Sequence, residues 1–269
     1  MGKARFAITS NEDSIAALID AWMLMVGRLP GHTIERSGGV ATIFAHVPMA
    51  LFNISVLDRP LPDAAEFKDA LGLARRRAET CRYASLVGFS TEWAPADWAD
   101  VMSKADAPLA LNMTGMAADH LLPARREAPA LEYRLIADVA TATDLAIVNA
   151  HAYGMPVSEV ECISNLHLWK EMSFGIVGYA GGRAVSCAAA FVIGDRIYVA
   201  MVATLPEAHG QGYAEAVMRR AIEHAQEAAG PKRIWLHASD MGWPLYRSMG
   251  FETGAELPLF AFQAGSADH

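Results

Sequence analysis

Apolar runs and amphipathic stretches follow one another in the second half of the chain. Three apolar runs, FGIVGYA, AVSCAAAFVI and IYVAMVATL, are separated only by Gly181-Gly182 and Gly194-Asp195. Glycine adopts positive φ without a steric penalty, so both dipeptides predict tight turns between antiparallel strands. The amphipathic stretch after the third run predicts a long helix that ends near residue 229. The other expected elements are a strand at EYRLI, helices near 141–153 and 157–169, a strand at RIWLHAS, a short helix near 242–249 and a closing strand at LPLFAFQ.

The first half repeats this order in outline, which predicts an internal duplication of one fold. Its expected elements are a helix near 11–26, strands near 33–37, 40–45 and 51–57, the helix EFKDALGLARRRAET and the strand YASLVGF. The local match between LVGFSTEWAPADW and WLHASDMGWPLY supports the duplication. We therefore predict the α/β (α+β) class, with a mixed, mostly antiparallel twisted sheet flanked by helices in each half. The segment 118–131, rich in proline and charge, predicts the linker between domains 1–122 and 123–269.

The bulk composition narrows the function classes. The chain has 269 residues, of which 53% are hydrophobic, and a formal net charge of −8. It therefore has the material for a packed core and lacks the basic charge typical of nucleic-acid binding. The short basic clusters at 75–77 and 125–126 are interpreted as solvated helix faces. Three cysteines without metal-ligand spacing predict reduced thiols and no metal site.

The sequence predicts a cytoplasmic protein without a membrane partner. No apolar run reaches the roughly 20 residues that a transmembrane helix needs. The start of the chain, MGKARFAITSNEDS, has no apolar core of signal-peptide length.

Two glycines, Gly210 and Gly212, stand where the long helix begins, although glycine weakens a helix by roughly 0.5–1 kcal/mol relative to alanine. The first amides of a helix lack partners within it, and the helix dipole adds positive charge there. Bare backbone at this point lets a phosphate approach closely. The spacing lacks the Lys-Ser/Thr of a P-loop and the three glycines of a dinucleotide fingerprint. An ordinary tight turn is the alternative interpretation.

A second motif favours a phosphate-binding loop over an ordinary tight turn. The strand that ends in His237-Ala238-Ser239 is followed by PLYRSMGFE at 244–252. The order of strand, T-x-P, Gly-x-Gly-x-Ala, helix, strand and L-Y-x-x-M-G-F resembles the GNAT superfamily of N-acetyltransferases, over about residues 131–262. The first half resembles the degenerate partner domain of tandem-GNAT proteins. The resemblance implies acetyl-CoA, or another acyl-CoA, as the acyl donor and an amine of a small molecule or peptide as the acceptor. It also implies direct attack in a ternary complex, and no metal.

The resemblance also assigns cofactor-binding positions. It implies that Val202 and Thr204, on a strand that splays from its neighbour, bind the pantetheine arm through their main chain. It implies that the loop amides hold the pyrophosphate, and this loop consists of His209, Gly210, Gln211, Gly212, Tyr213 and Ala214. The family usually has Arg or Gln at the first loop position, where this chain has His209. We therefore expect another cation at the phosphates, with Arg219, Arg220 and Lys232 as candidates.

The catalytic candidates are Tyr246, Ser239 and His237. Tyr246 matches the family tyrosine that protonates the departing thiolate, and a phenol of pKa about 10 is protonated at neutral pH. The alternative for Tyr246 is packing beside Phe251. Ser239 is expected either to bind the pantetheine arm or orient Tyr246, or to cap a helix. His237 and Glu161 are the candidate bases, and a structural histidine is the alternative for His237.

The two halves are expected to differ in function. In the first half, Asp63 and Glu66 stand about where the glycines stand in the second, and carboxylates there would repel a pyrophosphate. We therefore expect that the first half binds no cofactor and shapes the acceptor pocket. The segment 151–170 is expected to cover that pocket, with Tyr153 or Trp169 against the substrate. A homodimer stays open, as does a second function, a non-catalytic acyl-CoA sensor.

Overall fold

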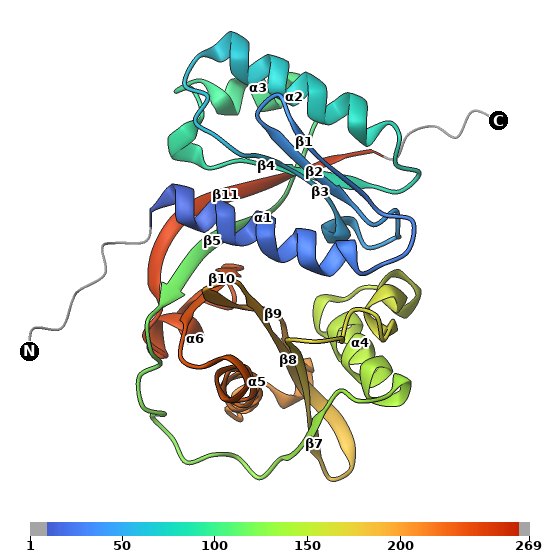
Figure 1. Cartoon of the computed structure of the whole chain (residues 1–269), viewed down its shortest axis with the longest axis vertical. Helices are drawn as coiled ribbons and strands as arrows, with labels where there is room; N and C mark the ends of the chain where they lie inside the picture. Colours follow the sequence, from blue (N-terminus) through green and yellow to red (C-terminus); the bar gives the residue numbers. More distant parts are fainter. Residues whose placement is uncertain (1–9, 264–269) are drawn as a thin grey trace, which may run out of the picture.

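A single mixed sheet runs through the computed structural model, which describes residues 10–263 (Figure 1). Its eleven strands have the order β1-β2-β3-β4-β11-β5-β10-β9-β8-β7-β6. The strands are β1 (Thr33–Ser37), β2 (Val40–Phe44), β3 (Asn53–Leu57), β4 (Ser85–Gly88), β5 (Leu109–Ala118), β6 (Glu132–Leu135), β7 (Ser173–Ala180), β8 (Arg183–Ile193), β9 (Arg196–Thr204), β10 (Arg233–Ala238) and β11 (Glu252–Phe262).

Helices cover both faces of this sheet. On one face, α1 and α4 pack over a core that extends through both halves. On the other face, α2 and α3 cover the first half, and α5 and α6 cover the second. The helices are α1 (Asn11–Gly27), α2 (Ala64–Ala78), α3 (Trp98–Lys104), α4 (Val139–Tyr153), α5 (Tyr213–Ala229) and α6 (Trp243–Ser248). Five short 3-10 helices complete the described elements, η1 (Ala50–Phe52), η2 (Thr91–Trp93), η3 (Val157–Glu159), η4 (Glu161–Ser164) and η5 (Pro206–Ala208).

The predicted α/β class and the repeated arrangement of helices and strands are confirmed. Positive φ at Gly181, Gly182 and Gly194 forms the turns of the predicted β7-β8-β9 meander. The two halves nevertheless share their sheet, because β11 pairs with β4 of the first half and β5 pairs with β10 of the second. The expectation that the closing strand completes the second half alone is therefore wrong. The boundary between residues 122 and 123 stays a prediction.

Three local features of the structure also differ from what the sequence predicted. The sequence reading missed α3 and β5, and β5 was obscured because Asn112 and Gly115 interrupt its apolar residues. The helix expected over 157–169 is two short 3-10 helices, η3 and η4. Beyond them, the Asn165 side chain accepts a hydrogen bond from the His167 amide (3.0 Å), a local bond that competes with helix formation.

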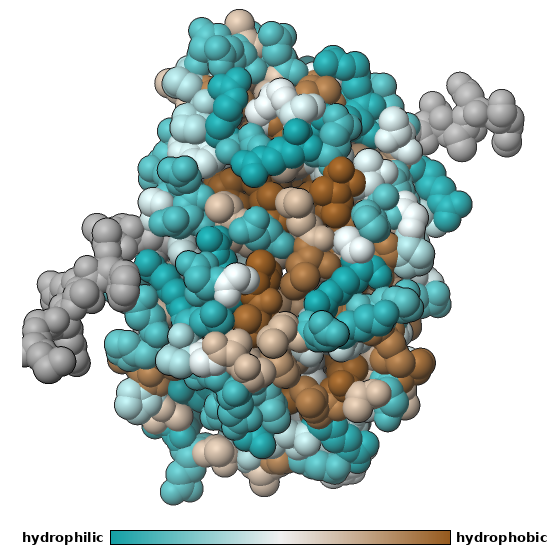
Figure 2. Space-filling model, in the orientation of Figure 1, coloured by the Kyte–Doolittle hydropathy of each residue, from teal (hydrophilic) through white to brown (hydrophobic). Residues whose placement is uncertain are grey.

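Helix α1 lies across the boundary between the two halves, between α2 and α3 above and α4 below in the view of Figure 1. Its apolar face contains Ile15, Leu18, Trp22 and Met25, all buried in the core shared by both halves. In Figure 2, apolar residues show through a mostly hydrophilic surface along this central band. Helix α1 thus packs on one face of the sheet where β5 and β11 join the two halves.

The contact of α1 with β5 depends on Gly115. A Cβ at this position would lie 1.9 Å from Ser14 Oγ and 3.2 Å from His237 Nε2. We expect Gly115→Ala to destabilise the fold by about 1–3 kcal/mol, because overpacking displaces α1. Ser14→Gly removes the obstructing side chain, so the double variant should lose less than the sum of the single changes. Denaturant unfolding of the four proteins measures this coupling, and strict additivity would contradict the contact.

Candidate functional site

Strands β9 and β10 are parallel neighbours that separate before either ends. Their pairing covers only Arg196 to Tyr198 opposite Arg233 to Trp235, while β9 continues to Thr204 and β10 to Ala238. On its other side, β9 pairs with β8, and this pairing shifts register between Cys187 opposite Ala203 and Ala189 opposite Ala200. The extra residue lies in β9, where Met201 has a φ of 54°, so β9 contains a bulge beyond the segment paired with β10. The splayed strand that the sequence analysis expected is therefore present.

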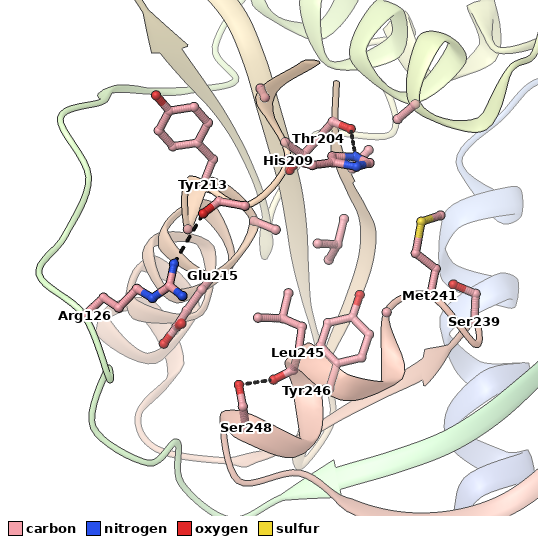
Figure 3. Close-up of a pocket in the computed structure, with 18 of the residues that line it drawn as sticks. Arg126, Thr204, His209, Tyr213, Glu215, Ser239, Met241, Leu245, Tyr246 and Ser248 are labelled. Atoms are coloured by element: carbon pink, nitrogen blue, oxygen red, sulfur yellow. Dashed lines mark hydrogen bonds between the residues drawn. The ribbon is translucent and has the colours of Figure 1, made fainter. Parts of the chain in front are cut away.

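A cavity of about 510 Å³ opens beside the diverging strands (Figure 3). It is bounded by the end of β9, the loop before α5, the turn after β10, helix α6 and the end of α4. The predicted site residues that line it are Val202, Thr204, His209, Gly210, Gly212, Tyr213, Ala214, Ser239 and Tyr246. Gln211 lines an adjacent cavity of about 420 Å³, which shares Arg126, Gly212 and Glu215 with the first.

The first turn of α5 presents free backbone amides. Gly210 and Gly212 have φ of 76° and 77°, a left-handed conformation that favours glycine, and no side chain caps the helix. The first helical hydrogen bond runs from the Ala216 amide to the Gly212 carbonyl, so the amides before it have no helical partner. Two lining elements, the loop and the helix end, thus offer donors to an anion.

The corresponding helix of the first half, α2, has no such free end. Its N-cap is Asp63, whose carboxylate accepts hydrogen bonds from the amides of Ala65 (2.9 Å) and Glu66 (3.0 Å). A fixed negative charge thus occupies the place that an anionic ligand would take. Leu61, in the preceding loop, is buried and hydrogen-bonded to the Trp93 carbonyl (2.8 Å).

Two side chains hold the carbonyls of β9 where β10 has moved away. The Tyr153 hydroxyl donates to the Val202 carbonyl (2.9 Å). His209 Nε2 lies 3.0 Å from the Thr204 carbonyl, with the ring turned toward the strand (Figure 3). Unpaired strand carbonyls need such partners, and a ligand with amide N–H groups can replace them.

Tyr246 lies on α6 and is 8% exposed as a residue, with its hydroxyl directed into the cavity (Figure 3). Burial raises the pKa of this phenol, with a smaller contribution from nearby Tyr153, so the hydroxyl is protonated at neutral pH. The ring also packs edge-on against Phe251, with centroids 6.0 Å apart. Both interpretations of Tyr246, an acid facing the cavity and a packing residue, therefore describe its environment.

Ser239 lies at the mouth of the cavity in the turn after β10. It does not cap α6 with its side chain, because the N-cap of that helix is Gly242 without a side-chain hydrogen bond. The Ser239 carbonyl instead accepts from the amides of Gly242 and Trp243, both at 3.0 Å. The capping alternative is thus wrong, and the turn brings the Ser239 side chain to the cavity.

His237 lies outside the cavity, which corrects its proposed role as the base. Its ring packs against α1, with Nδ1 2.9 Å from the Tyr198 hydroxyl and Nε2 3.3 Å from Ser14 Oγ. A neutral imidazole fits both contacts if Tyr198 donates to Nδ1 and Nε2–H donates to Ser14. Burial lowers the His237 pKa to about 3. Alternation along β10 places His237 on the α1 face, so this histidine joins helix and sheet.

The segment 157–169 is likewise absent from the cavity lining. Glu161, the other candidate base, lines a separate groove that also contains Leu29 and Tyr83 of the first half. Trp169 is buried, and its Nε1–H donates to the Ile163 carbonyl (2.7 Å). Of the two aromatic residues considered for substrate contact, the structure therefore brings only Tyr153 to the cavity.

The first half helps to hold this segment in place. Arg28, the C-cap of α1, donates hydrogen bonds to the carbonyls of Leu168 (2.9 Å) and Glu171 (2.7 Å). Burial lowers the pKa of this guanidinium, with Glu171 acting in the opposite direction. The contact joins the first half to the second away from the cavity lining, so the expectation that the first half shapes the acceptor pocket stays a prediction.

The cations near the site differ from those that the sequence suggested. Arg219 forms an ion pair with Glu215 (2.7 Å) and Arg220 one with Glu223 (3.1 Å), and Lys232 lines neither cavity. Arg125 and Arg126, interpreted as a solvated helix face, lie in a non-helical segment and line the main cavity. Sequence reasoning missed them because it treated the linker as a simple connection.

Within residues 10–263, none of the helices is both long and apolar enough to span a bilayer. Nor does this part of the chain contain a group of three or more His, Cys, Asp and Glu side chains suited to hold a metal ion.

Comparison with known proteins identifies the second half. The model of the acetyltransferase (GNAT) family matches residues 148–251, which contain the splayed strand, the glycine loop and Tyr246. Residues 148–251 belong to the acetyltransferase (GNAT) family. Membership supports acyl transfer in general, and the family uses acetyl-CoA. No curated protein matches the chain.

Solved structures extend the GNAT fold over the whole chain. A GCN5-related N-acetyltransferase from Kribbella flavida has a TM-score of 0.67 at 19% identity, over 92% of this chain and 95% of its own. A functionally unknown conserved protein from Staphylococcus epidermidis has a TM-score of 0.64 at 13% identity, over 88% and 95%. A tandem GNAT protein from the clavulanic acid biosynthesis pathway has a TM-score of 0.52 at 12% identity, over 97% and 98%. These likenesses show a tandem-GNAT fold.

The burial of His237 predicts how the stability of the protein depends on pH. Because folding lowers the His237 pKa to about 3, the unfolded chain takes up this proton below about pH 6.5 while the folded chain does not. Stability should therefore fall as the pH falls below about 6.5, with this residue contributing up to about 1.4 kcal/mol per pH unit. Denaturant unfolding between about pH 7 and pH 4 should show a shallower pH dependence for His237→Gln. An unchanged slope would contradict a neutral buried His237.

Proposed function

We propose that this chain is an N-acetyltransferase that moves an acetyl group from acetyl-CoA to an amine of a small molecule or peptide. The observation that carries the proposal is the position of Tyr246, whose hydroxyl faces the same cavity as the free amides before α5. A phosphate site alone would serve any nucleotide-like ligand. A protonated phenol beside it suits a reaction that releases a thiolate.

Different residues of the cavity are suited to bind different parts of acetyl-CoA. The amides from Gly210 to Ala214 suit the pyrophosphate, because they combine free donors with the positive end of the α5 dipole. The His209 amide already donates to the Pro206 carbonyl (3.3 Å). The carbonyls of Val202 and Thr204 suit the amide groups of the pantetheine arm, which would replace Tyr153 and His209 as their partners. Bound acetyl-CoA supplies an activated thioester.

Direct attack in a ternary complex needs no acylated side chain. Transfer forms a C–N bond to the acceptor amine and breaks the C–S bond of the thioester. Tyr246 donates its proton to the leaving thiolate and regains one from solvent, and the amine releases its extra proton to water. The raised pKa of Tyr246 keeps the donor proton available.

The first half is proposed to be a degenerate GNAT domain, residues 1–122, without a cofactor loop. The Asp63 cap on α2 supports this, because it fills the anion position with a carboxylate. The active domain is proposed to be residues 123–269. A cytoplasmic location, a homodimer and the absence of nucleic-acid and membrane partners stay sequence predictions.

Binding of the donor can be tested at Ala214, in the first turn of α5 and in the cavity wall. Ala214→Glu should weaken acetyl-CoA binding at least about tenfold, because a carboxylate then faces the phosphate position. Ala214→Gln is the matched control, with similar size and no charge, and should retain most of the affinity. Titration calorimetry measures both. Equal losses in the two variants would contradict a phosphate site here, and no binding by the parent protein would overturn the proposed function.

Catalysis can be tested with Tyr246→Phe, which keeps the contact with Phe251 and removes the proton donor. We expect kcat to fall roughly 100-fold while KM for acetyl-CoA changes little. In the parent protein, raised Tyr246 pKa predicts no loss of the acid below about pH 10. Thiol release with a panel of amines measures the rates. Tight acetyl-CoA binding without turnover in either protein would favour the sensor instead.

A further inference from the structure

The segment between the two halves is held against the GNAT domain at its start. The Leu122 amide donates to the Met249 carbonyl (2.8 Å), and the Leu122 carbonyl accepts from Arg219 (2.7 Å). Gly250, with φ of 101°, makes room for this crossing, since a Cβ there would lie 2.8 Å from Leu122 Cγ and 3.3 Å from Leu122 N. Arg125 and Arg126 therefore follow a fixed point only a few residues away.

Beyond Leu122, the segment runs past the glycine loop, residues 209–214. The Arg126 guanidinium donates to the Gly210 carbonyl (3.3 Å), and in Figure 3 its side chain reaches toward the loop from the strap that runs past α5. A guanidinium has five N–H groups in a planar fork, so this one bond leaves others free. Both Arg125 and Arg126 line the main cavity, and Arg126 also lines the neighbouring one.

The other cations at this end of α5 already have acidic partners. Arg219 and Arg220 are paired with Glu215 and Glu223. His209, at the first loop position, turns its ring to the Thr204 carbonyl. Within residues 10–263, neither Arg125 nor Arg126 forms an ion pair. The segment between the halves thus supplies the free positive charge beside the loop amides.

We propose that Arg125 and Arg126 bind the phosphate groups of the acyl-CoA donor, so that the connection between the halves forms one wall of the cofactor site. The assignment rests on the proposed function and deepens it. The loop amides supply directional donors to the anion, and the two guanidinium groups supply net positive charge beside them. The phosphates concerned are the pyrophosphate and the ribose phosphate, which share the same chemistry.

Titration calorimetry with coenzyme A, dephospho-coenzyme A and pantetheine tests the assignment on the full chain. Arg125→Gln and Arg126→Gln should each weaken coenzyme A binding at least about fivefold, and the double variant at least about twentyfold. Pantetheine carries no phosphate of the nucleotide, so its binding should not change. Arg220→Gln is the matched control, because Arg220 lines the neighbouring cavity but is already paired with Glu223.

Dephospho-coenzyme A then separates the two sources of phosphate. A loss as large as with coenzyme A assigns the arginines to the pyrophosphate, and a smaller loss assigns them to the ribose phosphate. If the parent binds coenzyme A and the arginine variants bind it equally well, the assignment is overturned and the proposed function stands. Equal losses in Arg220→Gln would overturn it as well, since general electrostatics would then suffice. If the parent protein binds no coenzyme A, the assignment of the arginines and the proposed function are both overturned.

Limited trypsin digestion gives a second readout on the unaltered protein. Trypsin cleaves after arginine, and the exposed 125–126 pair is accessible to it. Coenzyme A should slow cleavage at these two bonds at least about fivefold, while pantetheine at equal occupancy should not. Cleavage after Arg82, an exposed residue in a bend of the first half, serves as the internal reference. Equal protection at both places, or none at 125–126, would contradict the assignment.

Discussion

The separation of β9 from β10 is the constraint on which the rest of this site depends. After Tyr198 and Trp235 the strands no longer bond to each other, so carbonyls of β9 are left without a strand partner. Backbone groups that are not paired must find other partners or a ligand. Tyr153 and His209 fill this role in the structure, and the cavity opens where the strands part. The gap between two strands thereby becomes a place for an extended, amide-containing ligand.

The two halves differ in how the first amides of one helix are satisfied. Helix α5 begins at Gly212 without a cap, whereas α2 begins at Asp63, whose carboxylate bonds the amides of Ala65 and Glu66. The positive end of the helix dipole is thus left without a capping carboxylate in α5, whereas Asp63 neutralises it in α2. The exchange of β5 and β11 then joins the two halves through one sheet, so the closed half remains part of the framework of the open one.

The polar network on the far face of the sheet has a mechanical role rather than a chemical one. His237, Tyr198 and Ser14 join β10, β9 and α1 at the level where the strands begin to diverge. A neutral His237 there contacts both β9 and α1 close to the last paired residues of β9 and β10, while Tyr246 faces the cavity from α6. The two faces of the sheet can thus serve separate tasks, because successive side chains of a strand point to opposite faces.

The sequence by itself determined the β7-β8-β9 meander, the start of α5 and the position of Tyr246, because each depends on local φ preferences and on residue order along the chain. Only the tertiary structure decided which strands are exchanged, which face His237 occupies and which arginines reach the cavity. Strand β5 carries a glycine that is explained by Ser14 and His237, residues far away in the sequence. Arg125 and Arg126 acquire their place because Leu122 is anchored to Met249. Pairing and packing between distant segments contribute free energy that no local pattern records.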